Sequence, residues 1–428
     1  MSDSITIAPA VGPLQAEVRP PGSKSITNRA LVCAALAKGA STLTGALVSD
    51  DTQVMIESLG RLGISVALSD NGTTLRVDGS GGKIPAAEAE LFIGNSGTTI
   101  RFLTAMVSLG QGTYRLDGVP RMRERPIGDL VNALAQLRVE ASCESPGGCP
   151  PVLVKATGLP GGSASVRGNI SSQYLSGLLM AIPSAAGPVE LAIQGELVSQ
   201  PYVQMTLEVM RSFGVELTAR EDLSQFTSPG GQIYQACDYA IEPDASAASY
   251  FWAAAAIVGG SVTVAGLSTE SLQGDVAIVD LLEQMGCQVD RHSDRITVTG
   301  GKLKGISANM NAVSDMVQTI AAVALFAEGP TEITGVAHNR HKETDRIGAL
   351  ATELRKLGAE VDELEDGLRI TPGPLRPASV ETYDDHRMAM SLSLVGLKQP
   401  GIEILDPGCT SKTYPEFFDD MKKATSRS

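Results

Sequence analysis

The chain has 428 residues, 43% of them hydrophobic and 19% charged, and this composition suits a globular protein of several domains rather than a disordered or fibrous chain. Its net charge of -14 argues against nucleic acid as a partner, so an anionic ligand would need a local basic pocket. No apolar run approaches the roughly 20 residues of a membrane span, and residues 1–20 show no export or import signal, so we expect no membrane partner and a cytoplasmic location.

Two recurring patterns divide the chain into six units. A helix-like stretch that ends in two apolar residues, usually followed by glycine and a β-rich run, has its key position at 63, 138, 214, 286 and 358. A β-like run closed by glycine ends at Gly45, Gly118, Gly195, Gly266, Gly335 and Gly408. Both markers recur every 69 to 77 residues. The sequence therefore predicts six copies of one α/β unit.

Each unit is expected to contain a helix, a strand, a second helix and two more strands. Small polar residues, which favour helix N-termini, mark the first helix at 25–28, 96–98, 171–173, 245–246, 314–315 and 384–385. The sixth unit ends with its second helix, from Pro415 to about Ala424. We therefore expect the N-terminal runs Ser4–Ala8 and Leu14–Arg19 to supply its missing strands.

This closure predicts two α/β domains of three units each. The first covers residues 22–241, and the second combines residues 1–21 with 242–428. The chain would cross between them near 20–24 and 240–245, where Pro20-Pro21-Gly22 and Glu242-Pro243-Asp244 supply turn-forming residues. A two-strand hinge of this kind would let the domains close over a ligand.

Charged, turn-rich segments lie where most of the predicted helices begin. They are PPGSKSITNR (20–29), GNSGTTIR (94–101), PRMRERP (120–126), NISSQY (169–174), HNRHKETDR (338–346), DDHR (384–387) and CTSKT (409–413). A helix N-terminus stabilises an anion by only about 0.3 to 1 kcal/mol, and lysine and arginine add charge-assisted bonds to phosphate or carboxylate. Taken alone, each such cation is usually a solvated surface group. Seven segments together predict a site for small anionic substrates.

Two acidic residues and one histidine stand out in these segments. Asp315 follows a predicted helix start, and Glu343 lies between Lys342 and Arg346. Each carboxylate is either a salt-bridge partner or an acid–base group. His386 is either a structural hydrogen-bonding residue or a catalyst.

Six cysteines are spread along the chain without a CxxC pair, which predicts reduced thiols rather than disulfides or a zinc site. Cys143 and Cys149 flank a turn but have no histidine nearby, so a metal site is disfavoured. Cys409, three residues before Lys412, is interpreted as a buried thiol.

The segments PGSKSITNRA, LFIGNSGTTIR, PRMRERPIGDL, SSQYLSGLLM, SQPY, KETDRI, TYDDHRMAM and DPGCTSKTYPEFF resemble, in order and along essentially the whole chain, motifs of the EPSP synthase (3-phosphoshikimate 1-carboxyvinyltransferase) family. The resemblance implies a two-domain inside-out α/β barrel. It also implies transfer of the enolpyruvyl group of phosphoenolpyruvate to the 5-hydroxyl of shikimate 3-phosphate, with release of phosphate. A monomer that needs no metal or cofactor and is inhibited by glyphosate would be expected.

The family's functional positions carry over to this sequence residue by residue. The residues that match the phosphoenolpyruvate site are Lys24, Gly97, Arg125, Gln173, Glu343, Arg346, Arg387 and Lys412. Those that match the shikimate 3-phosphate site are Lys24, Ser25, Arg29, Ser171, Ser172, Gln173, Ser199, Tyr202, Asp315, His338 and Lys342. The resemblance implies that Asp315, Glu343 and Lys24 are catalytic, in an addition–elimination reaction through a tetrahedral ketal.

Three positions depart from the family pattern. Phe102 replaces a frequent proline, Gln200 replaces a common lysine, and His338 stands where an asparagine often contacts shikimate 3-phosphate, with Asn339 beside it.

Two other functions are compatible with parts of this pattern. A UDP-N-acetylglucosamine enolpyruvyl transferase would usually carry a cysteine in a first-domain loop, and the loop PRMRERP has none. A non-catalytic sensor of phosphorylated metabolites would need the cations but no acid–base pair.

Overall fold

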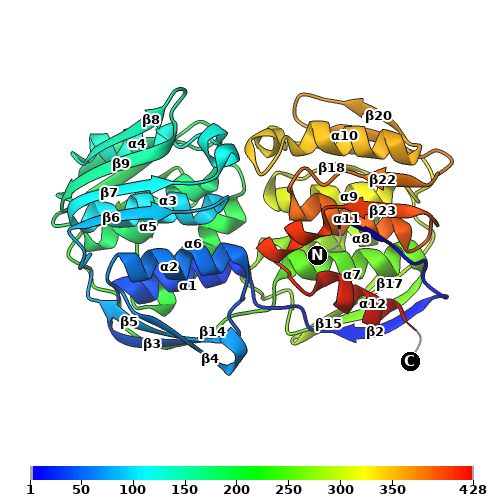
Figure 1. The fold of residues 1–428 in the computed structure, drawn as a ribbon, viewed down its shortest axis with the longest axis horizontal. Helices are drawn as coiled ribbons and strands as arrows, with labels where there is room; N and C mark the ends of the chain where they lie inside the picture. The colour runs from blue at the N-terminus through cyan, green and yellow to red at the C-terminus, as the bar shows by residue number, and fades with distance from the viewer. Residues whose placement is uncertain (1–2, 427–428) are drawn as a thin grey trace. The chain divides into compact units, whose positions relative to one another are not determined.

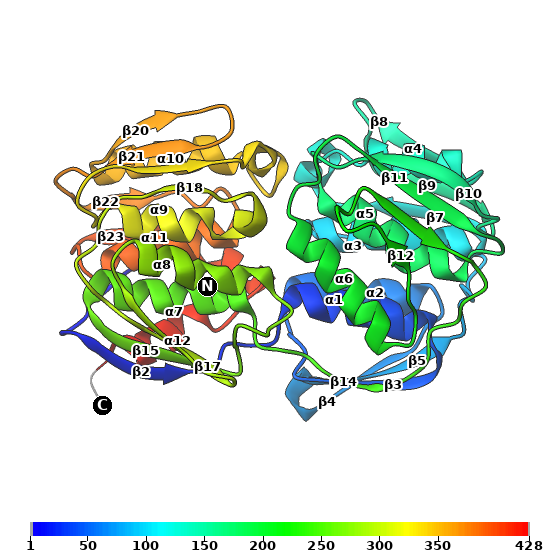
Figure 2. The ribbon, with the colours of Figure 1, turned by 180° about the vertical axis from the view of Figure 1, so that it is seen from behind.

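The computed structural model describes residues 3–426; the two outermost positions at each end, although part of the predicted second domain, lie outside the described residues. The chain separates into two compact units. Unit 1 comprises Met1–Pro21 and Glu242–Ser428, and unit 2 is the continuous stretch Gly22–Ile241. Figures 1 and 2 show the elements of each unit from opposite sides.

Unit 2 contains three four-stranded sheets and six α-helices among its elements. The first sheet has the order β14 (Asp238–Ala240), β3 (Lys38–Thr44), β5 (Thr74–Ser80), β4 (Val66–Ser69), with helices α1 (Lys24–Leu36) and α2 (Asp50–Arg61). The second has the order β6 (Glu88–Phe92), β7 (Gln111–Asp117), β9 (Cys149–Thr157), β8 (Glu140–Ser145), with α3 (Gly97–Met106) and α4 (Gly128–Gln136). The third has the order β10 (Gly162–Arg167), β11 (Val189–Gln194), β13 (Gln225–Ser228), β12 (Thr218–Ala219), with α5 (Ser172–Ala181) and α6 (Gln200–Ser212).

Unit 1 repeats this plan, with one shorter sheet. Its first sheet has the order β2 (Leu14–Val18), β15 (Gly260–Ala265), β17 (Arg295–Thr299), β16 (Gln288–Arg291), with α7 (Ala245–Val258) and α8 (Ile278–Gln284). Its second has the order β18 (Ser307–Asn309), β19 (Thr331–Thr334), β21 (Leu368–Thr371), β20 (Glu360–Glu363), with α9 (Val317–Ala324) and α10 (Arg346–Leu357). Its third has the order β1 (Ser4–Thr6), β23 (Ile402–Leu405), β22 (Ala378–Val380), with α11 (His386–Gly396) and α12 (Phe417–Thr425).

The six sheets confirm the predicted six repeats, three in each unit. In every four-stranded sheet the first edge strand is parallel to its neighbour and the remaining pairs are antiparallel. The parallel edge strand was not part of the predicted unit. Two of these strands, β14 and β18, and the parallel strand β22 of the three-stranded sheet are only three residues long, so their sequences carry almost no alternation.

The two N-terminal strands complete different sheets. β1 pairs antiparallel with β23 and so completes the sixth sheet, as predicted. β2 instead pairs in parallel with β15 of the fourth sheet, so the prediction that Leu14–Arg19 completes the sixth unit is wrong. β2 is the parallel edge strand of the fourth sheet, beside β15, just as β14 is the parallel edge strand of the first sheet, beside β3. An alternating pattern identifies a strand but does not identify its partner.

In five repeats, the first sequence marker lies one or two residues after the last residue of the second helix. Gly63, Gly214, Gly286 and Gly358 all adopt positive φ there, and Arg138 does so with φ 65°. A residue in the left-handed region after a helix lets backbone N–H groups satisfy the last carbonyls of that helix, and glycine adopts it without strain. The repeat seen in the sequence is therefore a repeated helix ending.

The first helix of each repeat lies in the core, and the sheets lie outside these helices (Figures 1 and 2). In unit 2, α3 packs against both α1 and α5, and in unit 1 α7, α9 and α11 pack against one another. Every residue of α3 and of α11 is buried. Burial on all sides is consistent with a position of these helices at the centre of their units.

Candidate active site

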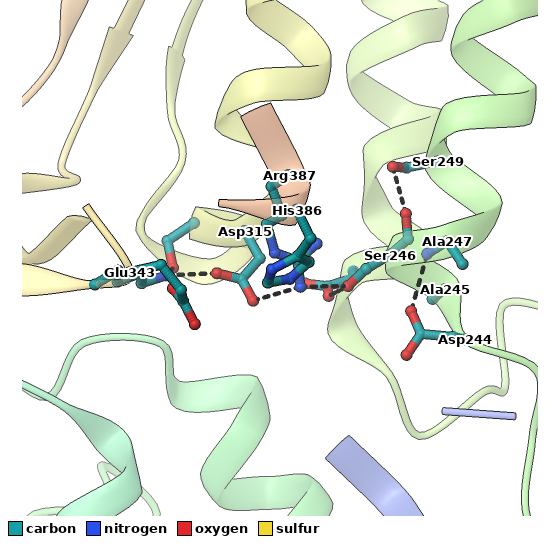
Figure 3. A network of polar contacts seen from close by, with 12 residues as sticks. Asp244, Ala245, Ser246, Ala247, Ser249, Asp315, Glu343, His386 and Arg387 are labelled. Atoms are coloured by element: carbon teal, nitrogen blue, oxygen red, sulfur yellow. Dashed lines mark hydrogen bonds and ion pairs between the residues drawn. The ribbon is translucent and has the colours of Figure 1, made fainter. Parts of the chain in front are cut away.

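Asp315 lies in the 3-10 turn Asn311–Met316 before α9, and its carboxylate accepts hydrogen bonds from three cations. Lys342 Nζ lies 2.5 Å and Arg346 Nη1 3.1 Å from Oδ1. Arg387 Nη2 lies 2.8 Å from Oδ2, and Figure 3 shows this pair. These cations come from the turn before α10, from the first residue of α10 and from the second residue of α11. Three separate segments of unit 1 thus converge on one carboxylate.

Arg346 connects Asp315 to two further carboxylates. Its Nε and Nη2 donate to both oxygens of Asp385, at 2.7 and 3.2 Å, and Nη2 lies 2.9 Å from Glu343 Oε2. Glu343 also accepts from Lys412 Nζ at 3.0 Å. The guanidinium is only 2% exposed. The cationic surroundings that both predicted acids require are therefore present within unit 1.

The charges around Asp315 control its ionisation. Burial alone raises the pKa of Asp315, but the Arg387, Lys342 and Arg346 charges outweigh burial and hold that pKa well below the usual carboxylate range. Burial also lowers the pKa of Lys342, although Asp315 opposes this shift. Asp315 is consequently ionised at neutral pH, and several positive charges surround it.

A strained turn presents the residues at the start of α11. Tyr383 and Asp384 both have left-handed backbone angles, with φ 56° and 52°, which cost about 1 to 3 kcal/mol each for residues other than glycine. Asp385 then caps α11 by accepting a hydrogen bond from the Arg387 amide at 2.9 Å. The Tyr383 hydroxyl donates to the buried Glu353 of α10 at 2.7 Å. Contacts with α10 therefore help to hold the turn that directs Asp385 towards Arg346.

The turn Ala337–His341, which contains His338, contacts the segment that carries Asp315. His338 is buried in the turn Ala337–His341, and burial, reinforced by the Lys342 charge, lowers its pKa to about 3. The side chain of Asn339 is directed inward and donates to the Ser314 carbonyl at 2.9 Å. His386 is 1% exposed, and its Nδ1 lies 3.8 Å from Asp385 Oδ1. His338 is thus neutral near pH 7, and Asn339 ties its turn to the segment that carries Asp315.

A second polar cluster surrounds the start of α3 in unit 2. Arg101 Nη1 donates to the Gly97 carbonyl at 3.1 Å and to Gln173 Oε1 at 2.9 Å. Arg125 donates to the Asn95 carbonyl at 3.1 Å and is 4% exposed. A methyl group on Gly97 would lie 2.4 Å from Arg125 Nη2 and 2.5 Å from Arg101 Nη1. Gly97 therefore leaves space for two guanidinium groups.

Arg101 was not among the predicted site residues. It ends the segment GNSGTTIR, four positions after Gly97, and residues four apart share one face of a helix. That spacing could have identified it.

Arg29 on α1 is buried among neutral groups, with an exposed fraction of 2%. It donates to the hydroxyls of Thr206 and Ser176 and to the carbonyls of Ser25 and Tyr202, at 2.8 to 3.4 Å. The Phe102 ring lies 5.1 Å from its guanidinium carbon. Burial lowers the pKa of Arg29 to about 10. Phe102, which departs from the family pattern, thus packs against a predicted substrate-binding cation.

The other predicted residues lie at or beside helix starts. Ser23 caps α1, whose first residues are Lys24 and Ser25, so this helix starts slightly earlier than predicted. Ser171 caps α5, whose first two residues are Ser172 and Gln173. Ser199 precedes α6, whose third residue is Tyr202. Lys412 is the last residue of the 3-10 turn that precedes α12.

The predicted positions divide between the units. Unit 2 holds Lys24, Ser25, Arg29, Gly97, Arg125, Ser171, Ser172, Gln173, Ser199 and Tyr202. Unit 1 holds Asp315, His338, Lys342, Glu343, Arg346, Arg387 and Lys412.

Within residues 3–426, no group of three or more histidine, cysteine or acidic side chains is placed to hold a metal ion. In the same residues, none of the helices has the length and apolar character needed to cross a bilayer. All six cysteines are free thiols. Burial raises the pKa of Cys409 to about 12, which disfavours its reactive thiolate form.

Comparisons with known proteins give one consistent result. The family model described as EPSP synthase (3-phosphoshikimate 1-carboxyvinyltransferase) matches residues 9–421. A 3-phosphoshikimate 1-carboxyvinyltransferase of Trichormus variabilis is 50% identical over 97% of this chain and 98% of its own length. The enzyme of the same name from a Marinomonas species is 48% identical over 97% and 98%. A solved EPSP synthase from Acinetobacter baumannii superposes with a TM-score of 0.83 at 25% identity, covering 99% of this chain and 98% of its own.

Proposed function

The chain belongs to the EPSP synthase family and transfers the enolpyruvyl group of phosphoenolpyruvate to shikimate 3-phosphate, and we propose that the two polar clusters described above supply its binding and catalytic groups. The observation that carries this proposal is Asp315 with its three cations. The half-buried Asp315 is a negative group for a hydroxyl, and Lys342, Arg346 and Arg387 around it provide positive charge for anionic ligands.

We propose that unit 2 recognises the anionic ends of the substrates. The helix starts that carry the serines of the shikimate 3-phosphate site expose backbone N–H groups suited to phosphate. Residues Lys24, Ser25, Arg29, Ser171, Ser172, Gln173, Ser199 and Tyr202 would form this part, and His338 and Lys342 would contribute from unit 1. Gly97, Arg125 and Gln173 would contact phosphoenolpyruvate. The contact of Gln173 with Arg101 supports a shared role, because it links α5 to the cluster at α3.

Unit 1 would supply the groups that move protons. Asp315, with Lys24, would accept the proton of the 5-hydroxyl, and Glu343 would protonate the phosphoenolpyruvate methylene and later remove a proton from the tetrahedral ketal. Asp315 is a weak base while its cations are uncompensated. Anionic substrates that neutralise these cations would raise its pKa and so increase its basicity. Arg346, Arg387 and Lys412 would bind phosphoenolpyruvate, and Lys412 with Lys24 and Arg125 would stabilise the departing phosphate.

We also propose that the segments crossing between the units act as a hinge. Asp244 donates its amide hydrogen to the Pro21 carbonyl at 2.8 Å, which pairs the two crossing segments. Scattering measurements should then show compaction when shikimate 3-phosphate is added. An unchanged radius of gyration in a free protein that is not already closed would contradict the hinge.

We propose further that the protein acts as a cytoplasmic monomer inhibited by glyphosate.

A direct assay distinguishes this function from the two alternatives. The protein is incubated with phosphoenolpyruvate and either shikimate 3-phosphate or UDP-N-acetylglucosamine, and released phosphate is measured. Release with shikimate 3-phosphate alone is expected. Release only with the nucleotide sugar would establish the first alternative, and binding without release would establish a sensor.

A further inference from the structure

Arg387 has a second acceptor besides Asp315. Its Nη2 lies 2.8 Å from Asp315 Oδ2 and 3.3 Å from the Ser246 hydroxyl oxygen (Figure 3). A terminal guanidinium nitrogen carries two hydrogens. Both hydrogens of this nitrogen therefore have an acceptor, one an acid and the other a hydroxyl.

The Ser246 hydroxyl is itself oriented by a buried acid. It donates to Asp275 Oδ2 at 2.6 Å. A hydroxyl has a single hydrogen, so this bond turns the oxygen lone pairs towards Arg387. The order is then carboxylate, hydroxyl, guanidinium, and each group orients the next one.

All three groups lie in the interior. Ser246 is 8% exposed, Asp275 4% and Arg387 5%. Water screens charges weakly there, and hydrogen bonds in such chains polarise one another. The negative charge of Asp275 therefore reaches Arg387 through the hydroxyl, on a different side from the charge of Asp315.

We propose that Asp275 is a positioning residue of the active site that acts through Ser246 to fix the guanidinium of Arg387. Asp275 belongs to the 3-10 turn Gly274–Ala277 and Ser246 to the first turn of α7, and neither element carries any other residue assigned to the site. The inference rests on the proposed role of Arg387 in binding phosphoenolpyruvate. Without the contact through Ser246, Nη2 of Arg387 would lose one of its two acceptors, and the guanidinium could turn away from its binding position.

The first test is Ser246→Ala, which removes the hydroxyl and keeps a good helix former. A hydrogen bond to a charged group is typically worth enough to change an equilibrium by about tenfold or more. We therefore expect KM for phosphoenolpyruvate to rise about tenfold, while kcat and KM for shikimate 3-phosphate change less than threefold.

Ser249→Ala is the matched control. Ser249 lies on the same helix, is fully buried, and its hydroxyl donates to the Ser246 carbonyl at 2.6 Å. This variant loses a similar buried hydrogen bond without removing an acceptor of Arg387. It should show a similar fall in melting temperature and an unchanged KM for phosphoenolpyruvate. An equal rise in KM for both variants would indicate a general packing effect and overturn the proposal.

Asp275→Asn provides the second test. If Asp275 acts only through Ser246, the double variant Asp275→Asn/Ser246→Ala should have the same KM for phosphoenolpyruvate as Ser246→Ala alone. Additive increases would overturn the proposal. If Asp275→Asn does not fold, the proposal is tested by comparing KM for phosphoenolpyruvate in Ser246→Ala and in Ser249→Ala.

The wild-type protein separates this inference from the proposed function. Failure of the wild type to release phosphate from its two substrates would reject the function. Normal wild-type turnover with an unchanged KM in Ser246→Ala would reject only the role of Asp275.

Discussion

Replacing Asp315 with asparagine would remove one negative charge and keep the shape of the side chain. The carboxylate now accepts hydrogen bonds from Lys342, Arg346 and Arg387 at 2.5 to 3.1 Å. Arg346 keeps its contacts with two other carboxylates. The lost negative charge therefore affects mainly Lys342 and Arg387. Their two positive charges would lie near each other with less negative charge to balance them.

The expected loss in the free energy of unfolding depends on how deeply this cluster is buried. Removing one partner of a buried ion pair typically costs about 3 to 5 kcal/mol. The side chain of Asp315 is 18% exposed, and asparagine keeps one acceptor, so we expect about 2 to 3 kcal/mol at pH 7. For a domain of this size, that loss lowers the melting temperature by about 4 to 12 °C.

The pH dependence gives the sharper test. The pKa of Asp315 is lower in the folded state than its unfolded value of about 3.9, so the unfolded state binds more protons in acid. The stabilisation by its charge is complete above that value and is lost as the pH falls through the folded pKa. Melting temperatures of the wild type and Asp315→Asn should therefore differ at pH 7, and the difference should begin to narrow below about pH 3.9 and close only below the folded pKa of Asp315. Equal stability at pH 7, or a gap that stays constant down to pH 3, would refute this reasoning.

The same variant tests the chemistry. Below its melting temperature, Asp315→Asn should lower turnover by about 10² to 10⁴-fold if the carboxylate accepts a proton. Turnover equal to the wild type would leave Asp315 as an ion-pair partner only.

Four further outcomes are expected. Glu343→Gln should lower turnover by about 10² to 10⁴-fold while retaining the fold, and normal turnover would limit Glu343 to ion pairing. Gly97→Ala should displace Arg125, whose Nη2 lies 2.4 Å from the added methyl position, and should raise the inhibition constant for glyphosate more than KM for phosphoenolpyruvate; equal factors would contradict a specific clash. Ser96→Ala removes the cap of α3 and should lower the melting temperature by about 2 to 4 °C, so an unchanged melting temperature would show that the cap is dispensable. Because the pKa of His338 is lowered to about 3, His338→Gln should leave the pH profile of kcat/KM unchanged between pH 5 and 8, whereas a lost acid limb would show that His338 titrates there.

The repeated architecture could be predicted because its markers have a conformational cause. One or two residues after the second helix of five repeats, the backbone adopts positive φ, and glycine at four of these five positions makes the period visible. Strand partners could not be predicted in the same way. β2 has a recognisable alternation, but only the packed structure places it beside β15 rather than in the sixth sheet.

The cations could be predicted as a group because they lie beside helix starts with visible capping residues. Their partners could not, because the contacts join distant segments. Asp385 reaches Arg346 across 39 positions, and the sequence DDHR alone does not distinguish a helix cap from an ion-pair partner. Asp275 and Ser246 are 29 positions apart and belong to no recognised motif, so only their contact reveals a relationship.

The pairing of β1 with β23 affects the order in which the chain can fold during its synthesis. Unit 2 is continuous, so all of it is available before most of unit 1 has been made. Ser4 on β1 bonds to Glu403 on β23 across 399 positions. Because domains fold as units while they emerge from the ribosome, unit 2 is expected to fold first. The strand β1 is made before unit 2 but cannot pair with β23 until β23 is made, so β1 is among the last strands to find its partner.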